Sequence, residues 1–145
     1  MAIALKTIPV QGGGWFKPKE NRDAVAVLIE VNQFDLQRPT PNGPKDSALC
    51  DVTVFKSAET LAAGTPEVAK GQRIEQTVLA RDLKDMVGAA VIVTLDQIPP
   101  SKPGQQPAWV WRTVHDAAIV QQVVDYANKR DEAAEAAIAD APDFD

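Results

Sequence analysis

The chain has 145 residues, of which 15 are basic and 20 acidic, for a formal net charge of −5. This length predicts one domain that can bury a core without covalent cross-links, and the single cysteine, Cys50, excludes a disulfide framework and a paired-thiol metal site. No run approaches the ~20 apolar residues of a membrane helix, and the N-terminus lacks a long hydrophobic signal core. We therefore expect a globular protein of the cytosol, or of a particle assembled there, with no membrane partner.

The negative charge is concentrated at the C-terminus. All basic residues lie at or before Arg130, and residues 131–145 carry six acids and no base. The other 14 acids stand against 15 bases, so residues 1–130 have a net charge of +1. The acidic character thus belongs to a tail, and the body is near neutral.

The chain begins with an apolar stretch, Met1 to Val10, followed by Gly12, Gly13 and Gly14. Three glycines do not hold a regular element cheaply, so they predict a flexible joint. Beyond them the periodicity of apolar residues predicts a series of strands and helices. In chain order these are strands over 24–31 and 48–56, a helical turn near 58–63, a strand over 73–79, a short helix over 80–88, strands over 89–95 and 108–114, and a helix from 116 to about 137.

This order predicts a mainly β fold, the five-stranded Greek-key barrel called the OB-fold, with its short helix between strands 3 and 4 and an appended C-terminal helix. In that fold the loops between strands 1–2 and 4–5 border the ligand face; here they are the proline-rich segments 32–47 and 96–107. We expect an N-terminal arm with a glycine joint over 1–22, the barrel over 23–114, an amphipathic helix over 115–137 and an acidic tail over 138–145. A generic β-sandwich or small barrel with long loops remains the alternative.

Catalytic patterns are sparse. His115 is the only histidine and lies at a strand-to-helix junction, which favours a capping or surface role. The three glycines lack the Lys-Ser/Thr of a phosphate loop and the spacing of a dinucleotide fingerprint. The carboxylates are scattered or in the tail. We therefore expect a protein that is not an enzyme and holds no metal or cofactor.

Aromatic and basic residues cluster around both long loops, as binding of a single nucleic-acid strand requires. Any one ring, such as Phe55 or a tryptophan, can equally belong to the core. The predicted contacts with single-stranded DNA are Trp15, Phe16, Lys17, Lys19, Phe34, Arg38, Lys45, Phe55, Lys56, Lys102, Trp109, Trp111 and Arg112.

The tail ends Asp140-Ala-Pro-Asp143-Phe144-Asp145, with one aromatic residue among carboxylates. An acidic tail can compete with DNA phosphates for a basic groove, and its aromatic residue can anchor in a partner. With this ending, the layout resembles the small OB-fold single-stranded-DNA-binding proteins of bacterial and phage replication. That resemblance implies recruitment of replication or recombination proteins through Asp140, Asp143, Phe144 and Asp145. The bacterial pattern ends in Phe itself, whereas here Asp145 follows it.

Two further segments, 38–46 and 102–109, are loosely similar to uncharacterised small proteins of actinobacterial phages. The competing interpretation is a phage virion protein, such as a capsid decoration or head–tail component. In that case Met1 to Val10 would add a strand to another subunit, giving a homo-oligomer. A single basic groove would favour DNA binding, and evenly distributed basic residues would favour the virion role.

Overall fold

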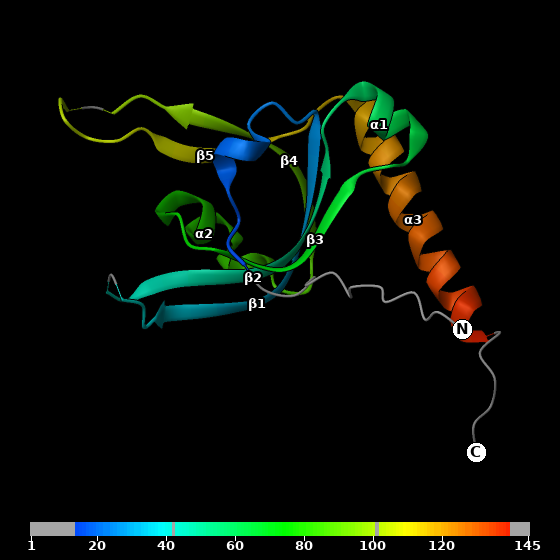
Figure 1. Ribbon diagram of the computed structural model, residues 1–145, viewed down its shortest axis with the longest axis horizontal. Helices are drawn as coiled ribbons and strands as arrows, with labels where there is room; N and C mark the ends of the chain where they lie inside the picture. Colours follow the sequence, from blue (N-terminus) through cyan, green and yellow to red (C-terminus); the bar gives the residue numbers. More distant parts are fainter. Residues whose placement is uncertain (1–13, 42, 101, 140–145) are drawn as a thin grey trace, which may run out of the picture.

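The computed structural model describes residues 14–41, 43–100 and 102–139. Its centre is one antiparallel sheet with the strand order β3-β2-β1-β4-β5 (Figure 1). The strands are β1 Ala26–Arg38, β2 Lys45–Phe55, β3 Glu67–Ile74, β4 Ala90–Ile98 and β5 Ala108–Thr113. The helices are α1 Ala58–Ala63, α2 Thr77–Leu83 and α3 Ala117–Ala139, with 3-10 turns η1 Pro18–Asn21 and η2 Lys84–Met86.

The central strand β1 is apolar on both sides because both faces of the sheet are covered. Val27 and Ile29 lie in a core with Leu79 and Leu83 of α2, on what we call the inner face. Leu28 and its neighbours pack in a second core on the outer face. A strand buried on both faces reads as a continuous apolar run, which is the pattern of residues 24–31.

The C-terminal helix covers the outer face. Val123 is fully buried there, and the Tyr126 ring meets the Phe55 ring edge-on at 5.4 Å between centroids. One turn later, Arg130 donates to both oxygens of Glu30, at 2.7 and 3.1 Å, and this contact raises the pKa of the Arg130 guanidinium. A bidentate pair of this kind fixes direction as well as distance. It therefore orients α3 on the sheet, and the helix runs to Ala139, slightly beyond the expected end.

The sheet is not closed into a barrel. In the part of the chain that the structure describes, β3 and β5 do not pair and form its two edges. The N-terminal segment lies between them: Trp15 forms a parallel bridge with Arg73 beside β3, and the Phe16 ring contacts Trp111 of β5 at 5.7 Å. Residues 14–22, which we expected in an arm outside the barrel, are thus part of the body. This segment contacts both edge strands.

The expected strand over 73–79 is wrong. β3 lies earlier, at Glu67–Ile74, and α2 begins at Thr77. The helix expected over 80–88 thus begins earlier, and Leu79, which we placed at the end of the strand, lies with Leu83 on the buried face of α2. A short apolar pattern of this length fits either element, and packing against the sheet selected the helix.

Both proline-rich loops are shorter than expected because the strands extend into them. β1 pairs with β4 only over Val27–Glu30, whereas it pairs with β2 as far as Arg38. Two register shifts, after Val31 and after Asp35, bend this extension. The β1–β2 and β4–β5 hairpins therefore project to the same side of the molecule, with α2 between them (Figure 1). No helix of the described chain combines the length and hydropathy needed to cross a bilayer.

Candidate nucleic-acid interface

Trp15 is the aromatic side chain most open to solvent among the described residues, with 53% of its surface exposed. Its backbone is nevertheless fixed. The Phe16 N–H donates to the Arg73 carbonyl at 2.9 Å, and the Arg73 N–H donates to the Gly14 carbonyl at 3.0 Å. Gly14 has φ +103°, a left-handed value that side chains rarely adopt, and its missing Cβ would lie 3.3 Å from Gln72. The indole of Trp15 is therefore exposed while its backbone is fixed to the edge of β3.

The guanidinium of Arg38 lies over this indole, with its Cζ 5.8 Å from the ring centroid. That distance is within the range of a cation–π contact. Arg38 also donates to Glu75 at 3.0 Å, and the Glu75 side chain is only 10% exposed. Because Arg38 ends β1 and Glu75 follows β3, this ion pair ties the β1–β2 hairpin to the end of β3, the strand to which Trp15 is bridged.

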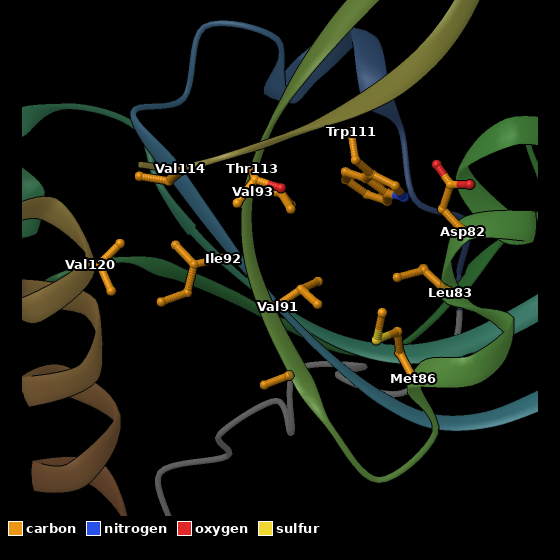
Figure 2. Close-up of a pocket in the computed structure, with 11 residues that line it drawn as sticks. Asp82, Leu83, Met86, Val91, Ile92, Val93, Trp111, Thr113, Val114 and Val120 are labelled. Atoms are coloured by element: carbon orange, nitrogen blue, oxygen red, sulfur yellow. The ribbon is translucent and has the colours of Figure 1, made fainter. Parts of the chain in front are cut away.

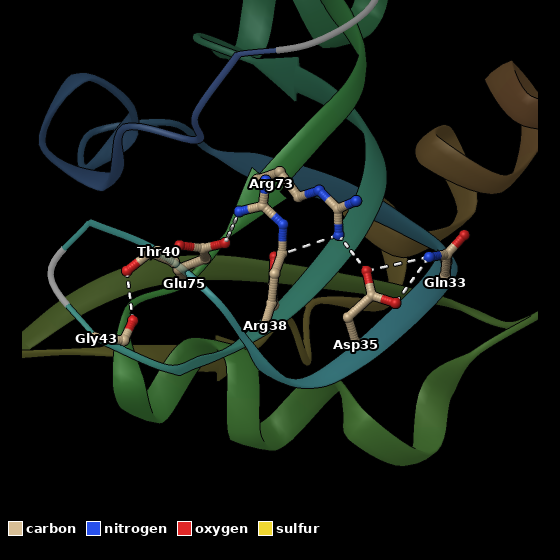
Figure 3. A network of polar contacts seen from close by, with 8 residues as sticks. Gln33, Asp35, Arg38, Thr40, Gly43, Arg73 and Glu75 are labelled. Carbon is tan, nitrogen blue, oxygen red and sulfur yellow. Dashed lines mark hydrogen bonds and ion pairs between the residues drawn. The ribbon is translucent and has the colours of Figure 1, made fainter.

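A second ion pair also ties the β1–β2 hairpin to β3, at an earlier position along β1 (Figure 3). Arg73 donates to Asp35 at 2.6 Å, and Gln33 donates to both oxygens of that carboxylate. The Arg73 hydrogen bond, followed by that of Gln33, holds the pKa of Asp35 below its ordinary value of 3.8. The hairpin is therefore held against β3 by two Arg–carboxylate ion pairs as well as by apolar packing.

Beside Trp15 the surface is hollowed into a cleft of about 410 Å³, which we call the Trp15 cleft. It is lined by Trp15, Thr40, Pro41, Lys45, Glu75 and Gln76. Lys45, at the start of β2, is exposed, and no ion pair holds it among the described residues. The cleft thus combines an aromatic face, a free ammonium group and a shielded carboxylate.

The structure brings together three of the predicted contacts here: Trp15, Arg38 and Lys45. Lys17 lines a second hollow, which Trp15 also borders, and Lys19 is exposed in η1. Lys56 is committed elsewhere, because its ammonium donates to the Glu20 carbonyl at 2.6 Å. That bond anchors η1 to the end of β2.

The expectation that Phe16 and Phe55 stack on bases must be corrected. Phe16 is 3% exposed and Phe55 is fully buried. Phe16 packs in the inner core against Trp111, and Phe55 packs in the outer core against Tyr126. Neither ring presents a face to a base, so both belong to the core.

Trp109 and Trp111 share one side of β5, as alternation predicts, but that side packs against the inner core. The Trp111 Nε1 group donates to the Leu79 carbonyl at 3.0 Å, which fixes the ring against α2. Phe34 is likewise half-buried against the same core. These three rings contribute packing, and their expected role as an open stacking surface does not match their placement.

The β4–β5 hairpin carries two predicted cations. Lys102 is exposed near its tip, and Arg112 donates to Asp96 at 3.2 Å. The Gln97 backbone N–H, and then Arg112, lower the pKa of Asp96. Arg112 is therefore partly neutralised, whereas Lys102 has no ion pair within the described chain.

The other predictions concern the C-terminal tail, the lone cysteine and metal binding. The predicted partner contacts Asp140, Asp143, Phe144 and Asp145 lie outside the described residues. Cys50 is fully buried, and desolvation raises the pKa of its thiol to about 12, which makes it unreactive. Among the described residues, no group of three or more His, Cys, Asp or Glu side chains has the arrangement of a metal site.

The sequence reasoning missed Thr40, Pro41, Glu75 and Gln76 as lining residues of the cleft. The position of Pro41 could have indicated this role, since it lies in the loop expected to border the ligand face. Nothing in the sequence indicated it for Glu75 and Gln76, because both fell inside the strand expected over 73–79, whereas β3 begins six residues earlier, at Glu67. No family model matches the chain, and neither does any curated protein or solved structure.

Proposed function

We propose that this protein binds single-stranded DNA without sequence preference, and that the Trp15 cleft is the centre of the interface. The observation that carries the proposal is the exposed indole of Trp15, held rigidly at a sheet edge with Arg38 over it and Lys45 beside it. Single-strand binding needs a π-face for an unstacked base and cations for the adjoining phosphates, and these three residues provide both.

The strand order supports an OB-like interpretation of the fold. A sheet of order β3-β2-β1-β4-β5 becomes a closed barrel when its edges β3 and β5 meet. An OB-fold is a partly open barrel whose nucleic-acid ligand lies between the loops that join strands 1–2 and 4–5. Here those loops end the two projecting hairpins (Figure 1). Lys45 begins β2 directly after the first loop, and Lys102 lies in the second. We infer that a strand bound at Trp15 continues toward the β4–β5 hairpin.

The electrostatics favour a moderate affinity. Arg38, Arg112 and Lys56 each contact a carboxylate, so they offer less than a full charge to a phosphate. Lys17, Lys19, Lys45 and Lys102 are exposed and lack an ion pair in the described part of the chain. Since each phosphate contact on a single strand contributes about −0.7 to the slope of log K against log salt, four lysines give a slope near −3. The acidic tail, in this proposal, competes for the same cations and recruits replication or recombination proteins.

The test is titration of fluorescein-labelled oligo-dT followed by anisotropy at ~50 mM salt. Trp15→Ala should lose about 1–3 kcal/mol of binding free energy, and Trp15→Phe should keep most of it because a ring remains. Leu36→Ala is the matched control, since Leu36 is 61% exposed on the same hairpin and lines no part of the cleft. Equal affinity of Trp15→Ala and wild type would place the interface elsewhere. No binding by wild type at micromolar concentration would refute the function itself.

The virion role is the second candidate, and one observation favours it. Six basic residues form ion pairs with carboxylates on several elements instead of facing one groove: Arg38, Lys56, Arg73, Arg81, Arg112 and Arg130. Charges paired in this way suit a surface that meets other protein subunits. If oligo-dT does not bind, assembly in a phage particle becomes the leading proposal, and purified virions should then contain the chain.

A further inference from the structure

The outer edge of β4 is open where the strand begins. β4 pairs with β1 over Ala90–Val93, whereas its pairing with β5 starts only at Val93. The Val31 N–H donates to the Ala89 carbonyl, so alternation turns the N–H and C=O of Ala90 away from β1. Just beyond β5 the Val114 N–H donates to the Ile92 carbonyl at 3.2 Å, so within the described chain this edge lacks a neighbouring strand only at Ala90. Unpaired backbone groups of this kind are a template for another strand.

An apolar cleft of about 490 Å³, the β4-edge cleft, surrounds this open edge (Figure 2). Leu83 and Met86 line it on the side of α2, and Ile92 and Val120 line it on the side of α3. Met86 is 36% exposed although it is large and apolar. An added strand would therefore find backbone partners at the edge and an apolar hollow on each side of it. That is the arrangement by which sheets bind extended peptides.

The charge of the cleft restricts what can enter. Asp82 is the only charged residue that lines it; its side chain is 46% exposed, and the Arg81 guanidinium 3.4 Å away offsets part of its charge. The other lining residues are uncharged, so an acidic segment would bury carboxylates there without a cation to pair with them. The cleft fits an extended, apolar, non-acidic peptide.

Two terminal segments of this chain lie outside the described residues. The tail, residues 140–145, carries three acids and is the wrong charge for the cleft. The first ten residues carry no acid, one cation at Lys6, and the large apolar residues Ile3, Leu5 and Ile8. Pro9 is their only proline, so each residue from Ala2 to Ile8 keeps the N–H that a ladder needs.

We propose that residues 1–10 of a second copy of this chain pair with β4 at Ala90, with Ile3 and Leu5 in the β4-edge cleft. A second copy is favoured over the same molecule because Gly14 is bonded to Arg73 at the far side of β3. The buried side chains of Phe16, Leu79 and Leu83 fill the interior between that point and the cleft. Reciprocal exchange of the two segments gives a closed two-fold dimer. The proposal does not depend on DNA binding.

Sedimentation of the full-length protein over a concentration series tests the dimer. Wild type should dimerise, and Leu5→Asp should raise the dimer dissociation constant by at least about tenfold. Gln11→Asp is the matched control, since it adds the same charge outside the docking segment and should leave the dimer unchanged. A wild type that stays monomeric at every concentration overturns the proposal, as does an equal effect of the two substitutions.

The cleft side is tested with a fluorescent peptide of residues 1–10 added to the full-length Leu5→Asp protein. The peptide should bind saturably. Binding should be lost when Met86→Lys is introduced, whereas Val87→Lys should retain it, because Val87 is 51% exposed next to Met86 yet does not line the cleft. Ala90→Pro removes an N–H that points away from β1 at a position where β4 has no neighbour on that side, so the sheet tolerates it, and it should also abolish binding. Circular dichroism confirms that each variant is folded. Peptide binding that survives both Met86→Lys and Ala90→Pro refutes the site.

Discussion

The two hairpins that project from the sheet look alike in the sequence, yet they are held by different interactions. Each consists of a proline-rich connection flanked by aromatic and basic residues. The β1–β2 hairpin is tied to β3 by the ion pairs Arg73–Asp35 and Arg38–Glu75. The β4–β5 hairpin is instead anchored by Trp109 and Trp111, which pack on the inner core.

This difference decides which aromatic residue is free to bind. Ion pairs hold the β1–β2 hairpin at its polar surface, so Trp15 beside it remains exposed. The tryptophans of the β4–β5 hairpin are used for packing, and only Lys102 near the tip remains open. Aromatic residues near a loop therefore predict binding only where another interaction supports the loop.

The largest expected effect is a difference in stability between alanine variants of Trp111 and Trp15. Trp111→Ala should lower the free energy of unfolding by about 2–4 kcal/mol, because the ring leaves a cavity against Phe16 and the Leu79 carbonyl loses its donor. Trp15→Ala should lower it by less than about 1 kcal/mol, since most of that ring faces solvent. Urea unfolding measures both. Equal losses would mean that the two rings play the same role, contrary to the comparison of the hairpins.

A smaller effect concerns the carboxylates of the two hairpins. The pKa of Asp35 is lowered chiefly by the Arg73 side chain, whereas that of Asp96 is lowered chiefly by the Gln97 backbone N–H. Arg73→Gln should therefore move the Asp35 pKa back toward 3.8, and Arg112→Gln should move the Asp96 pKa less. Carboxyl-carbon NMR titration gives both values.

The lowered pKa of Asp35 also decides how the stability of the β1–β2 hairpin changes with pH. A lowered folded-state pKa means that the folded chain favours ionised Asp35, so this contribution to stability is present above pH 3.8. It is lost as the pH falls through the lowered value, and amide exchange in the β1–β2 hairpin should then accelerate. Asp35→Asn should make that exchange independent of pH over this range, apart from the intrinsic exchange rate. A hairpin whose protection does not change on acidification would show that apolar contacts hold it.

The smallest effect is expected from the tail. Deleting residues 140–145 removes three acids and changes the formal charge from −5 to −2. Affinity for oligo-dT should rise a few-fold at low salt and much less at high salt, where charges are screened. Asn in place of the three tail Asp residues is the control that keeps the length. Phe144→Ala should leave DNA affinity unchanged, and a change there would mean that the ring itself enters the groove.

Much of the fold could be predicted from the sequence where periodicity and burial agree. The apolar runs around Val27 and Val93 predicted two strands. The spacing of Val120, Val123, Val124 and Ala127 predicted the C-terminal helix and the burial of all four, and the helix is present with Val123 as its buried anchor, but Val124 is 38% exposed. The turn at 58–63 is the helix α1, with a capping box between Ser57 and Thr60. These segments have strong local patterns that the tertiary structure does not override.

The rest depended on contacts between residues far apart in the chain. Nothing local distinguishes Trp15 from Phe16, yet the bridge to Arg73 leaves one exposed and buries the other. Likewise, the extension of β1 to Arg38 requires ion pairs with Arg73 and Glu75, which lie 38 and 37 residues away along the chain from their partners. Exposure of an aromatic residue thus depends on the tertiary structure. The structure was therefore needed to select, from the predicted DNA contacts, those that lie together at Trp15.

The position of residues 14–22 between β3 and β5 has a consequence for how the molecule forms. This segment is synthesised before every strand, but its partners are Arg73 and Trp111, and Arg22 bonds with Gln97 across 75 residues. Contacts of such long range slow folding, because the loop must close before they can form. The first part of the body to leave the ribosome therefore has to wait for the last strand, and we expect it to dock as a late kinetic step after the sheet has assembled.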